Sequence, residues 1–221
     1  FIGIGLIAGL LSGLFGVGGG TVIVPLLVLF LHFNQRLGAG TSLAAIVPTA
    51  TVGVISYAIN GSVAWIPALI LAAGSVVGAQ IGTRMLPKIS QTVLRWFFVG
   101  FLVVVIVSLF LVIPSRDAEF ELQLLNGIAL VLVGVATGIL AGLIGVGGGV
   151  IVVPILMLAF GTSDLVAKGT SLLMMIPTAI SGTIGNLRNR NVDLVAAALV
   201  GVSACTLSLI HISEPTRQAE I

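Results

Sequence analysis

Two nearly identical stretches decide the fold of this chain: GLFGVGGGTVIVP at Gly13–Pro25 and GLIGVGGGVIVVP at Gly142–Pro154. A shift of 129 residues overlays them without a gap. The same shift aligns two further motifs, GTSL and PTA, in each copy: Gly40–Leu43 with Gly169–Leu172, and Pro48–Ala50 with Pro177–Ala179. Shared low complexity would scatter matches instead of keeping one offset. Since repeats define the architecture of a chain that has them, we interpret the sequence as two copies of one unit.

The composition indicates a membrane protein. Hydrophobic residues make up 58% of the 221 residues and charged residues 7%, against roughly 25% charged residues in soluble domains. The apolar runs suit the ~20 helical residues that cross a bilayer. The sequence therefore predicts an all-α integral membrane protein, a polytopic helical bundle of about eight or nine transmembrane segments. The expected segments are 1–16, 17–33, 41–59, 63–85, 92–113, 124–144, 146–161, 169–187 and 192–210.

The charges predict how the two copies are oriented. We divide the chain into transmembrane repeat 1 (1–113), an acidic extracytoplasmic linker (114–123) and an incomplete transmembrane repeat 2 (124–205). If the first span runs outward, the loops with cationic residues fall on the cytoplasmic side, which Lys and Arg favour. These cations are Arg36, Arg84, Lys88, Arg95, Arg188 and Arg190. We therefore predict two inverted-topology repeats with Gly-rich interrupted helices.

The two ends of the chain do not follow the repeat. Phe1 already lies in an apolar run, so we expect the natural start to lie upstream. Gly78 and Gly82 have Leu207 and His211 as their repeat mates, and SLIHISEPTR resembles translated adapter sequence. We expect residues 206–221 to be a non-native tail and leave them out of functional reasoning. The alternative is a natural, divergent terminus.

Glycines recur at a spacing of four residues in three stripes: Gly5, Gly9 and Gly13; Gly134, Gly138 and Gly142; Gly74, Gly78 and Gly82. This spacing places small residues on one helix face, where another backbone can approach closely. We therefore expect the stripes to pack helices together. The alternative is that they line a pore.

The GVGGG segments, Gly16–Gly20 and Gly145–Gly149, are candidate binding turns. Four glycines in five residues disfavour a regular helix, and a break inside a membrane survives only where protein or water satisfies the freed backbone groups. Exposed N–H groups before a helix start can bind an anion. The alternative is two tight loops at the membrane surface. A nucleotide-binding P-loop is excluded because no Lys-Ser/Thr pair follows.

The GTSL and PTA motifs supply hydroxyls and prolines. We expect Thr41, Ser42, Thr170 and Ser171 at helix starts, where they either cap the helix or bind an oxyanion. Together with the turns, they give the predicted substrate-binding residues: Gly16, Gly18, Gly19, Gly20, Thr41, Ser42, Gly145, Gly147, Gly148, Gly149, Thr170 and Ser171. Proline breaks the helical hydrogen-bond ladder, which predicts kinks or gates at Pro25, Pro48, Thr49, Pro154, Pro177 and Thr178.

Several functions are disfavoured by what the sequence lacks. No Asp, Glu, Lys or Arg lies in the middle of an expected span, although proton-driven pumps usually need one. No catalytic triad or metal-ligating motif is evident, so we expect no enzyme, no catalytic residue, no metal and no cofactor.

At the doubled G-x-x-x-G-x-x-G-V-G-G-G-x-x-x-V-P motif, followed by GTS and PTA, the chain resembles the sulfite exporter TauE/SafE family of bacterial and archaeal permeases. The resemblance covers roughly residues 1–205. It implies a multi-pass protein of the cell (inner) membrane that moves sulfite, organosulfonates or related anions, mostly outward. The expected partners are a small anion and the lipid bilayer, without nucleic acid. Whether the chain forms a homo-oligomer is left open. Alternatives are a channel-like permease for another solute and a non-transporting scaffold subunit.

Overall fold

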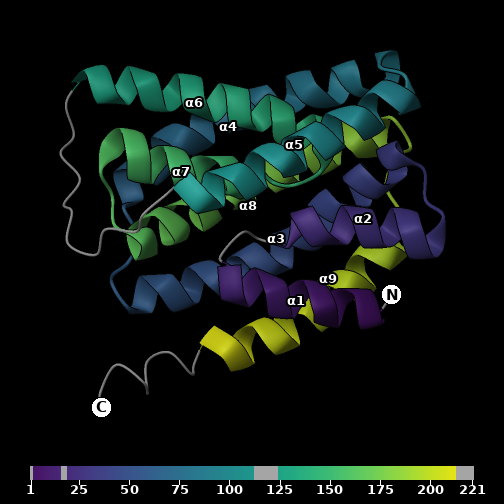
Figure 1. Ribbon diagram of the computed structural model, residues 1–221, viewed down its shortest axis with the longest axis horizontal. Coiled ribbons are helices and arrows are strands. Elements are labelled where there is room, and N and C mark those ends of the chain that lie inside the picture. Colours follow the sequence, from purple (N-terminus) through teal and green to yellow (C-terminus); the bar gives the residue numbers. More distant parts are fainter. Residues whose placement is uncertain (1, 16–18, 112–123, 213–221) are drawn as a thin grey trace.

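The computed structural model of the chain describes residues 2–15, 19–111 and 124–212, and every regular element in these residues is a helix (Figure 1). The helices are α1 (Ile2–Phe15), α2 (Gly20–Leu31), α3 (Gln35–Ile59), α4 (Trp65–Met85), the short 3₁₀ helix η1 (Leu86–Lys88), α5 (Gln91–Leu111), α6 (Leu124–Ile144), α7 (Gly149–Phe160), α8 (Asp164–Arg188) and α9 (Leu194–Ile212). The expected linker at 114–123 lies outside the described residues, as does the expected tail beyond Ile212.

Four stretches of helix are long and apolar enough to cross a membrane: Gln35–Ile59, Trp65–Lys88, Gly127–Ile144 and Asp164–Arg188. The polytopic helical membrane fold predicted from the composition is therefore confirmed. Two expected spans are shorter than predicted, because α2 and α7 have 12 residues each. At 1.5 Å per residue they extend about 18 Å, too little to cross the ~30 Å hydrocarbon core alone.

The duplication extends to the helix boundaries. The first residues of α2, α3 and α4 lie 129 positions before those of α7, α8 and α9. Asn34 caps α3 by accepting a hydrogen bond from Leu37 N–H, and its repeat mate Ser163 caps α8 through Val166 N–H. The expectation that the GTS motifs start these helices is wrong, because these caps begin each helix two turns earlier.

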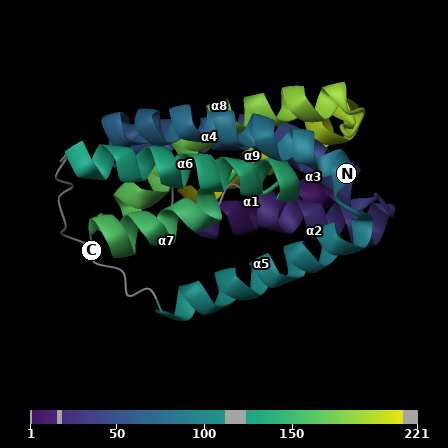
Figure 2. The ribbon, with the colours of Figure 1, turned by 90° about the horizontal axis from the view of Figure 1, so that it is seen from above.

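Helices that correspond in the two copies run in opposite directions. Gly53 of α3 lies against Leu172 of α8, and Gly182 of α8 lies against Leu43 of α3, so these two helices are antiparallel. Similar pairings along the other interfaces show that α1, α3 and α9 run one way and α4, α6 and α8 the other. Figures 1 and 2 show all of them aligned with the long axis of the molecule.

Contacts between the copies are reciprocal. Thr41 Oγ1 accepts a hydrogen bond from Asp193 N–H at 3.0 Å, and Thr170 Oγ1 accepts one from Ala64 N–H at 3.0 Å. Thr170 and Asp193 are the repeat mates of Thr41 and Ala64, so each contact occurs twice with the partners exchanged. Such exchange is the mark of a two-fold relation between like units, here within one chain.

The glycine stripes pack backbone against backbone, as predicted. A Cβ on Gly78 of α4 would lie 2.2 Å from Val135 O, and one on Gly138 of α6 would lie 2.2 Å from Ser75 O. Gly5 and Gly9 of α1 face α9 in the same way. These distances leave no room for a side chain, so the stripes fix how closely the helices approach.

The cationic residues lie mostly at one end of the bundle. The starts of α3 and α5 and the ends of α4 and α8 lie there, with the cations Arg36, Arg84, Lys88, Arg95, Arg188 and Arg190. Among the residues that the structure describes, Lys168 is the single cation at the opposite end, where it pairs with Asp164 at 2.7 Å. The expected grouping of the cationic loops is therefore seen in the fold.

We predict that Gly138→Ala destabilises the protein. The new methyl group would meet the backbone of Ser75, and overpacking of this kind costs about 1–3 kcal/mol. Gly100→Ala is the matched control, because nothing lies within 4 Å of a Cβ at Gly100 and Ala is favoured over Gly in a helix by up to ~1 kcal/mol. Thermal unfolding in detergent measures both. A Gly138→Ala protein as stable as the control would contradict the packing role.

Candidate functional site

The second Gly-rich turn separates α6 from α7 in the interior of the protein. Its backbone has positive φ at Gly145 (82°), Gly147 (80°) and Gly148 (88°), a conformation that glycine adopts readily and other residues disfavour. Residues 141–150 are all buried. The predicted interruption of the helix therefore occurs, and the turn is not a loop at the surface of this chain.

The first turn matches the second where the structure describes it. Gly19 precedes α2 with φ 74°, as its repeat mate Gly148 precedes α7 with φ 88°. Gly16 and Gly18 lie outside the described residues. A Cβ on Gly20 would lie 2.8 Å from both Cα and O of Val146. The start of α2 therefore lies directly against the second turn, so the two halves meet here.

The second turn holds buried donors that have no acceptor among the described residues. Gly145 N–H donates to Ala141 O, but the N–H groups from Val146 to Gly149 donate to no residue that the structure describes. Buried backbone N–H groups are nearly always paired with protein, water or a ligand. This row of donors at the positive end of α7 is suited to an anion.

Two apolar side chains pack against the second turn. A Cβ on Gly147 would lie 2.6 Å from Met175 Cε and 3.2 Å from Ile46 Cδ1. Met175 Sδ comes equally close to Gly149, and Ile46 Cδ1 reaches Gly20. Both side chains are completely buried. Ile46 and Met175 are repeat mates, so one residue from each copy closes the site.

Known proteins can now be compared with this arrangement. The profile of one family, described as sulfite exporter TauE/SafE, matches residues 1–109 and 129–213. The chain belongs to the sulfite exporter TauE/SafE family. This confirms the resemblance indicated by the doubled glycine motif. The TauE/SafE match also includes residues 206–213 of the expected tail, and α9 continues to Ile212.

Relatives of this TauE/SafE protein are named as membrane transporters. The probable membrane transporter proteins YdhB and YunE of Bacillus subtilis are 29% and 30% identical to the chain, covering 87% and 89% of it and 81% of each relative. One from Methanocaldococcus jannaschii is 27% identical over 83% of the chain and 70% of its own length. No solved structure matches the chain. The protein is thus a multi-pass membrane transporter and not an enzyme, as predicted.

The threonines of the two GTS motifs have a structural task in this TauE/SafE fold. Thr41 and Thr170 are buried and accept hydrogen bonds from the N-cap residues of α9 and α4. They therefore link the two copies, and these contacts do not involve the glycine turns. Sequence reasoning missed this role because the donors lie 152 and 106 residues away along the chain.

The serines of the same motifs differ between the copies. Ser42 Oγ is buried and has no hydrogen-bond partner among the described residues. Ser171 Oγ lies 3.6 Å from a Cβ placed on Gly149 and donates to Lys168 O at 2.8 Å. Of the four predicted hydroxyls, Ser171 is the one for which a contact near the second turn is seen.

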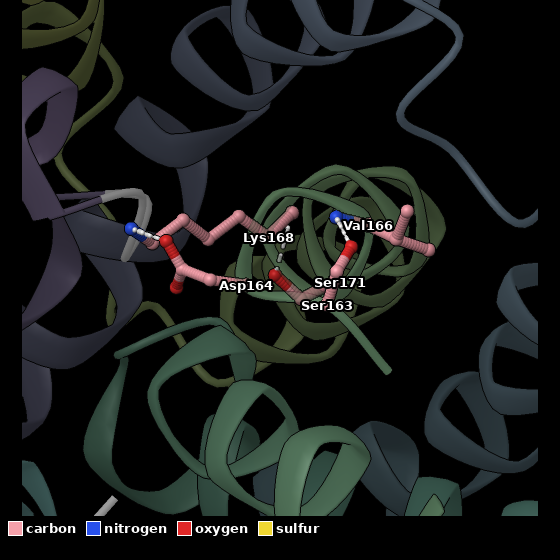
Figure 3. A network of polar contacts seen from close by, with 5 residues as sticks. All are labelled: Ser163, Asp164, Val166, Lys168 and Ser171. Carbon is pink, nitrogen blue, oxygen red and sulfur yellow. Dashed lines mark hydrogen bonds and ion pairs between the residues drawn. The ribbon is translucent and has the colours of Figure 1, made fainter. Parts of the chain in front are cut away.

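A polar network leads from Ser171 back to the start of α8 (Figure 3). Lys168 Nζ donates to Asp164 Oδ2 at 2.7 Å, one helical turn from the backbone contact of Ser171. Ser163 in the same view caps the helix. The ion pair is neutral as a whole, so it adds no net charge at this end of α8.

The predicted kink residues all lie inside helices. Pro25 and Pro154 occupy the sixth positions of α2 and α7, and Pro48 and Pro177 lie within α3 and α8. The hydroxyls beside the latter two bond their own helices: Thr49 Oγ1 donates to Ile46 O at 2.9 Å, and Thr178 Oγ1 donates to Met174 O at 2.7 Å. Both acceptors belong to the Ile46 and Met174–Met175 segments that cover the turn. A gating role stays a prediction.

We predict that Thr41→Val or Thr170→Val lowers stability by about 1 kcal/mol each, the usual net value of one hydrogen bond. Each change removes an acceptor that links the copies. Thr51→Val is the matched control, because that exposed hydroxyl bonds only its own helix at Val47 O. Denaturation in detergent measures the effect. If the Thr41 and Thr170 variants were as stable as the control but bound anions more weakly, the hydroxyls would serve the ligand instead.

Proposed function

We propose that this protein is a secondary transporter that exports small sulfur-containing anions, such as sulfite or organosulfonates, across the cell (inner) membrane. The observation that carries the proposal is the row of buried N–H groups from Val146 to Gly149 that donate to no described residue, at the point where the two halves meet. Membership of the sulfite exporter TauE/SafE family supports the same class of substrate.

The chemistry of the second turn favours an oxyanion. Oxygen atoms of sulfite or a sulfonate would accept hydrogen bonds from consecutive N–H groups, and the dipole of α7 adds favourable potential at its start. Glycine at Gly147 and Gly148 lets the ligand approach the backbone closely. Since no charged side chain takes part, the site can release its ligand without breaking a strong ion pair.

Transport requires that the site opens. Met175 and Ile46 pack closely against the turn, so we propose that an anion reaches the donors only when these side chains move. Methionine is unbranched and has flexible torsions, whereas isoleucine is stiff at χ1. We therefore assign the larger movement to Met175, and we assign access from the two membrane faces to rocking of one half against the other.

We further propose that the halves are inverted in the membrane. Corresponding helices run in opposite directions, and the described cations other than Lys168 gather at one end. Because Lys and Arg favour the cytoplasmic side, the cation-rich end would face the cytoplasm. This places one glycine turn on a segment entering from each face, an arrangement used by secondary transporters with interrupted helices.

We predict electrogenic efflux without obligatory proton coupling. The charged side chains in the described helices lie near helix ends, so no buried carboxylate is placed to carry a proton. Each exported negative charge gains about 2.3 kcal/mol per 100 mV when the inside is negative. Sulfite release from proteoliposomes with an imposed voltage tests this.

Three other results would count against the proposal. Flux that needs a pH gradient and ignores voltage would refute electrogenic efflux. Equal flux of chloride, sodium and taurine would indicate a channel-like permease, and no flux of any sulfur oxyanion would favour a scaffold.

We predict that Gly147→Ala lowers sulfite flux by roughly tenfold or more, as expected when an oxyanion-binding donor is lost or blocked. Gly161→Ala is a control for backbone strain, since Gly161 also has positive φ (64°) but a Cβ there has nothing within 4 Å. Unfolding temperatures confirm that both variants fold. Equal flux in the two variants would exclude the turn as the binding site.

A further inference from the structure

A groove of about 470 Å³ lies on the outside of the bundle between α3, α8 and α9. Its walls are almost wholly apolar and include Ile180, Ile184, Ala198 and Val202. Ile180 is 44% exposed and Val202 64% exposed, so the groove opens outward and is separate from the buried glycine turns. Its size falls within the range of small-molecule sites, ~300–1,000 Å³. In a membrane-spanning bundle this opening faces lipid.

The groove leads to the cation-rich end of the molecule. Ile180, Ile184 and Arg188 are four residues apart and share one face of α8, so the arginine continues the line of the groove wall. Arg190 follows in the turn before α9. Both arginines are exposed, and neither forms a hydrogen bond or ion pair with a described residue. The nearby carboxylate of Asp193 accepts Ala196 N–H and caps α9.

A single hydroxyl lies among the apolar groups of the groove. Thr183 lines the groove, and its Oγ1 is buried without a hydrogen-bond partner in the described chain. Ile184 follows it on α8, and Arg188 follows one helical turn later. The order of exposed groups is therefore cation and then apolar wall, from the membrane edge inward.

From this order we infer that the groove binds an anionic phospholipid. The phosphate pairs with Arg188 and Arg190, and one acyl chain lies along the face formed by Ile180, Ala198 and Val202. A neutral lipid would satisfy the apolar wall but not the two arginines, which have no partner among the described residues. An inorganic anion would leave the wall exposed. Basic pockets between membrane helices on the cytoplasmic side are suited to such headgroups.

Lipid retention in native mass spectrometry tests the inference. Purified protein in detergent receives phosphatidylglycerol or phosphatidylcholine at equal concentrations. We expect phosphatidylglycerol to bind more tightly, by about fivefold for each arginine that contacts the phosphate. Arg188→Gln with Arg190→Gln should remove this preference. Arg95→Gln is the matched control, because Arg95 is exposed at the same end but lies on α5, which contributes no residue to the groove.

A second pair of variants tests the groove itself. Ala198→Trp fills it and should lower retention of both lipids, whereas Val195→Trp, also exposed on α9 but outside the lining, should not. Size-exclusion chromatography checks that each variant folds. Equal binding of the two lipids, displacement of phosphatidylglycerol by inorganic phosphate at the same concentration, or unchanged retention in Ala198→Trp would each overturn the inference.

Discussion

The close approach of helix backbones at the glycine stripes is the constraint on which the other features depend. Lipid tails are as apolar as leucine side chains, so the hydrophobic effect does little to associate helices inside a bilayer. In this protein Gly74, Gly78 and Gly82 of α4 instead pack against backbone atoms of α6, and Gly134, Gly138 and Gly142 of α6 pack against α4. This contact holds α6 as far as Gly142, and the second Gly-rich turn begins at Gly145, directly after α6 ends.

The two copies share their backbone and differ in the side chains around it. The caps, most helix boundaries and the left-handed positions repeat at one offset, whereas Ile46 in one copy corresponds to Met175 in the other. Since the donors of the site are main-chain groups, both copies can keep them while their covering residues diverge. If these side chains gate the site as proposed, their different stiffness makes the two ways of opening it unequal in energy.

Sequence reasoning predicted the features that local pattern determines. The broken helix at Gly145–Gly149 and the packing of the glycine stripes follow from conformational cost and residue size. The starts of α3 and α8 were misplaced because their caps, Asn34 and Ser163, are different residues at equivalent positions. The contacts of Thr41 and Met175 were missed for another reason. Their partners come from the other half of the chain, and no spacing in a single sequence reveals such contacts.

The reciprocity of the contacts has a consequence for how such a chain arises. Thr41 with Asp193 and Thr170 with Ala64 are one contact made twice, so each half is complementary to a copy of itself turned over. A shorter ancestor able to insert in the membrane in both orientations would already form this interface as an antiparallel homodimer. Fusion of two genes would then make the pairing permanent, and afterwards the halves could specialise, as Ile46 and Met175 have.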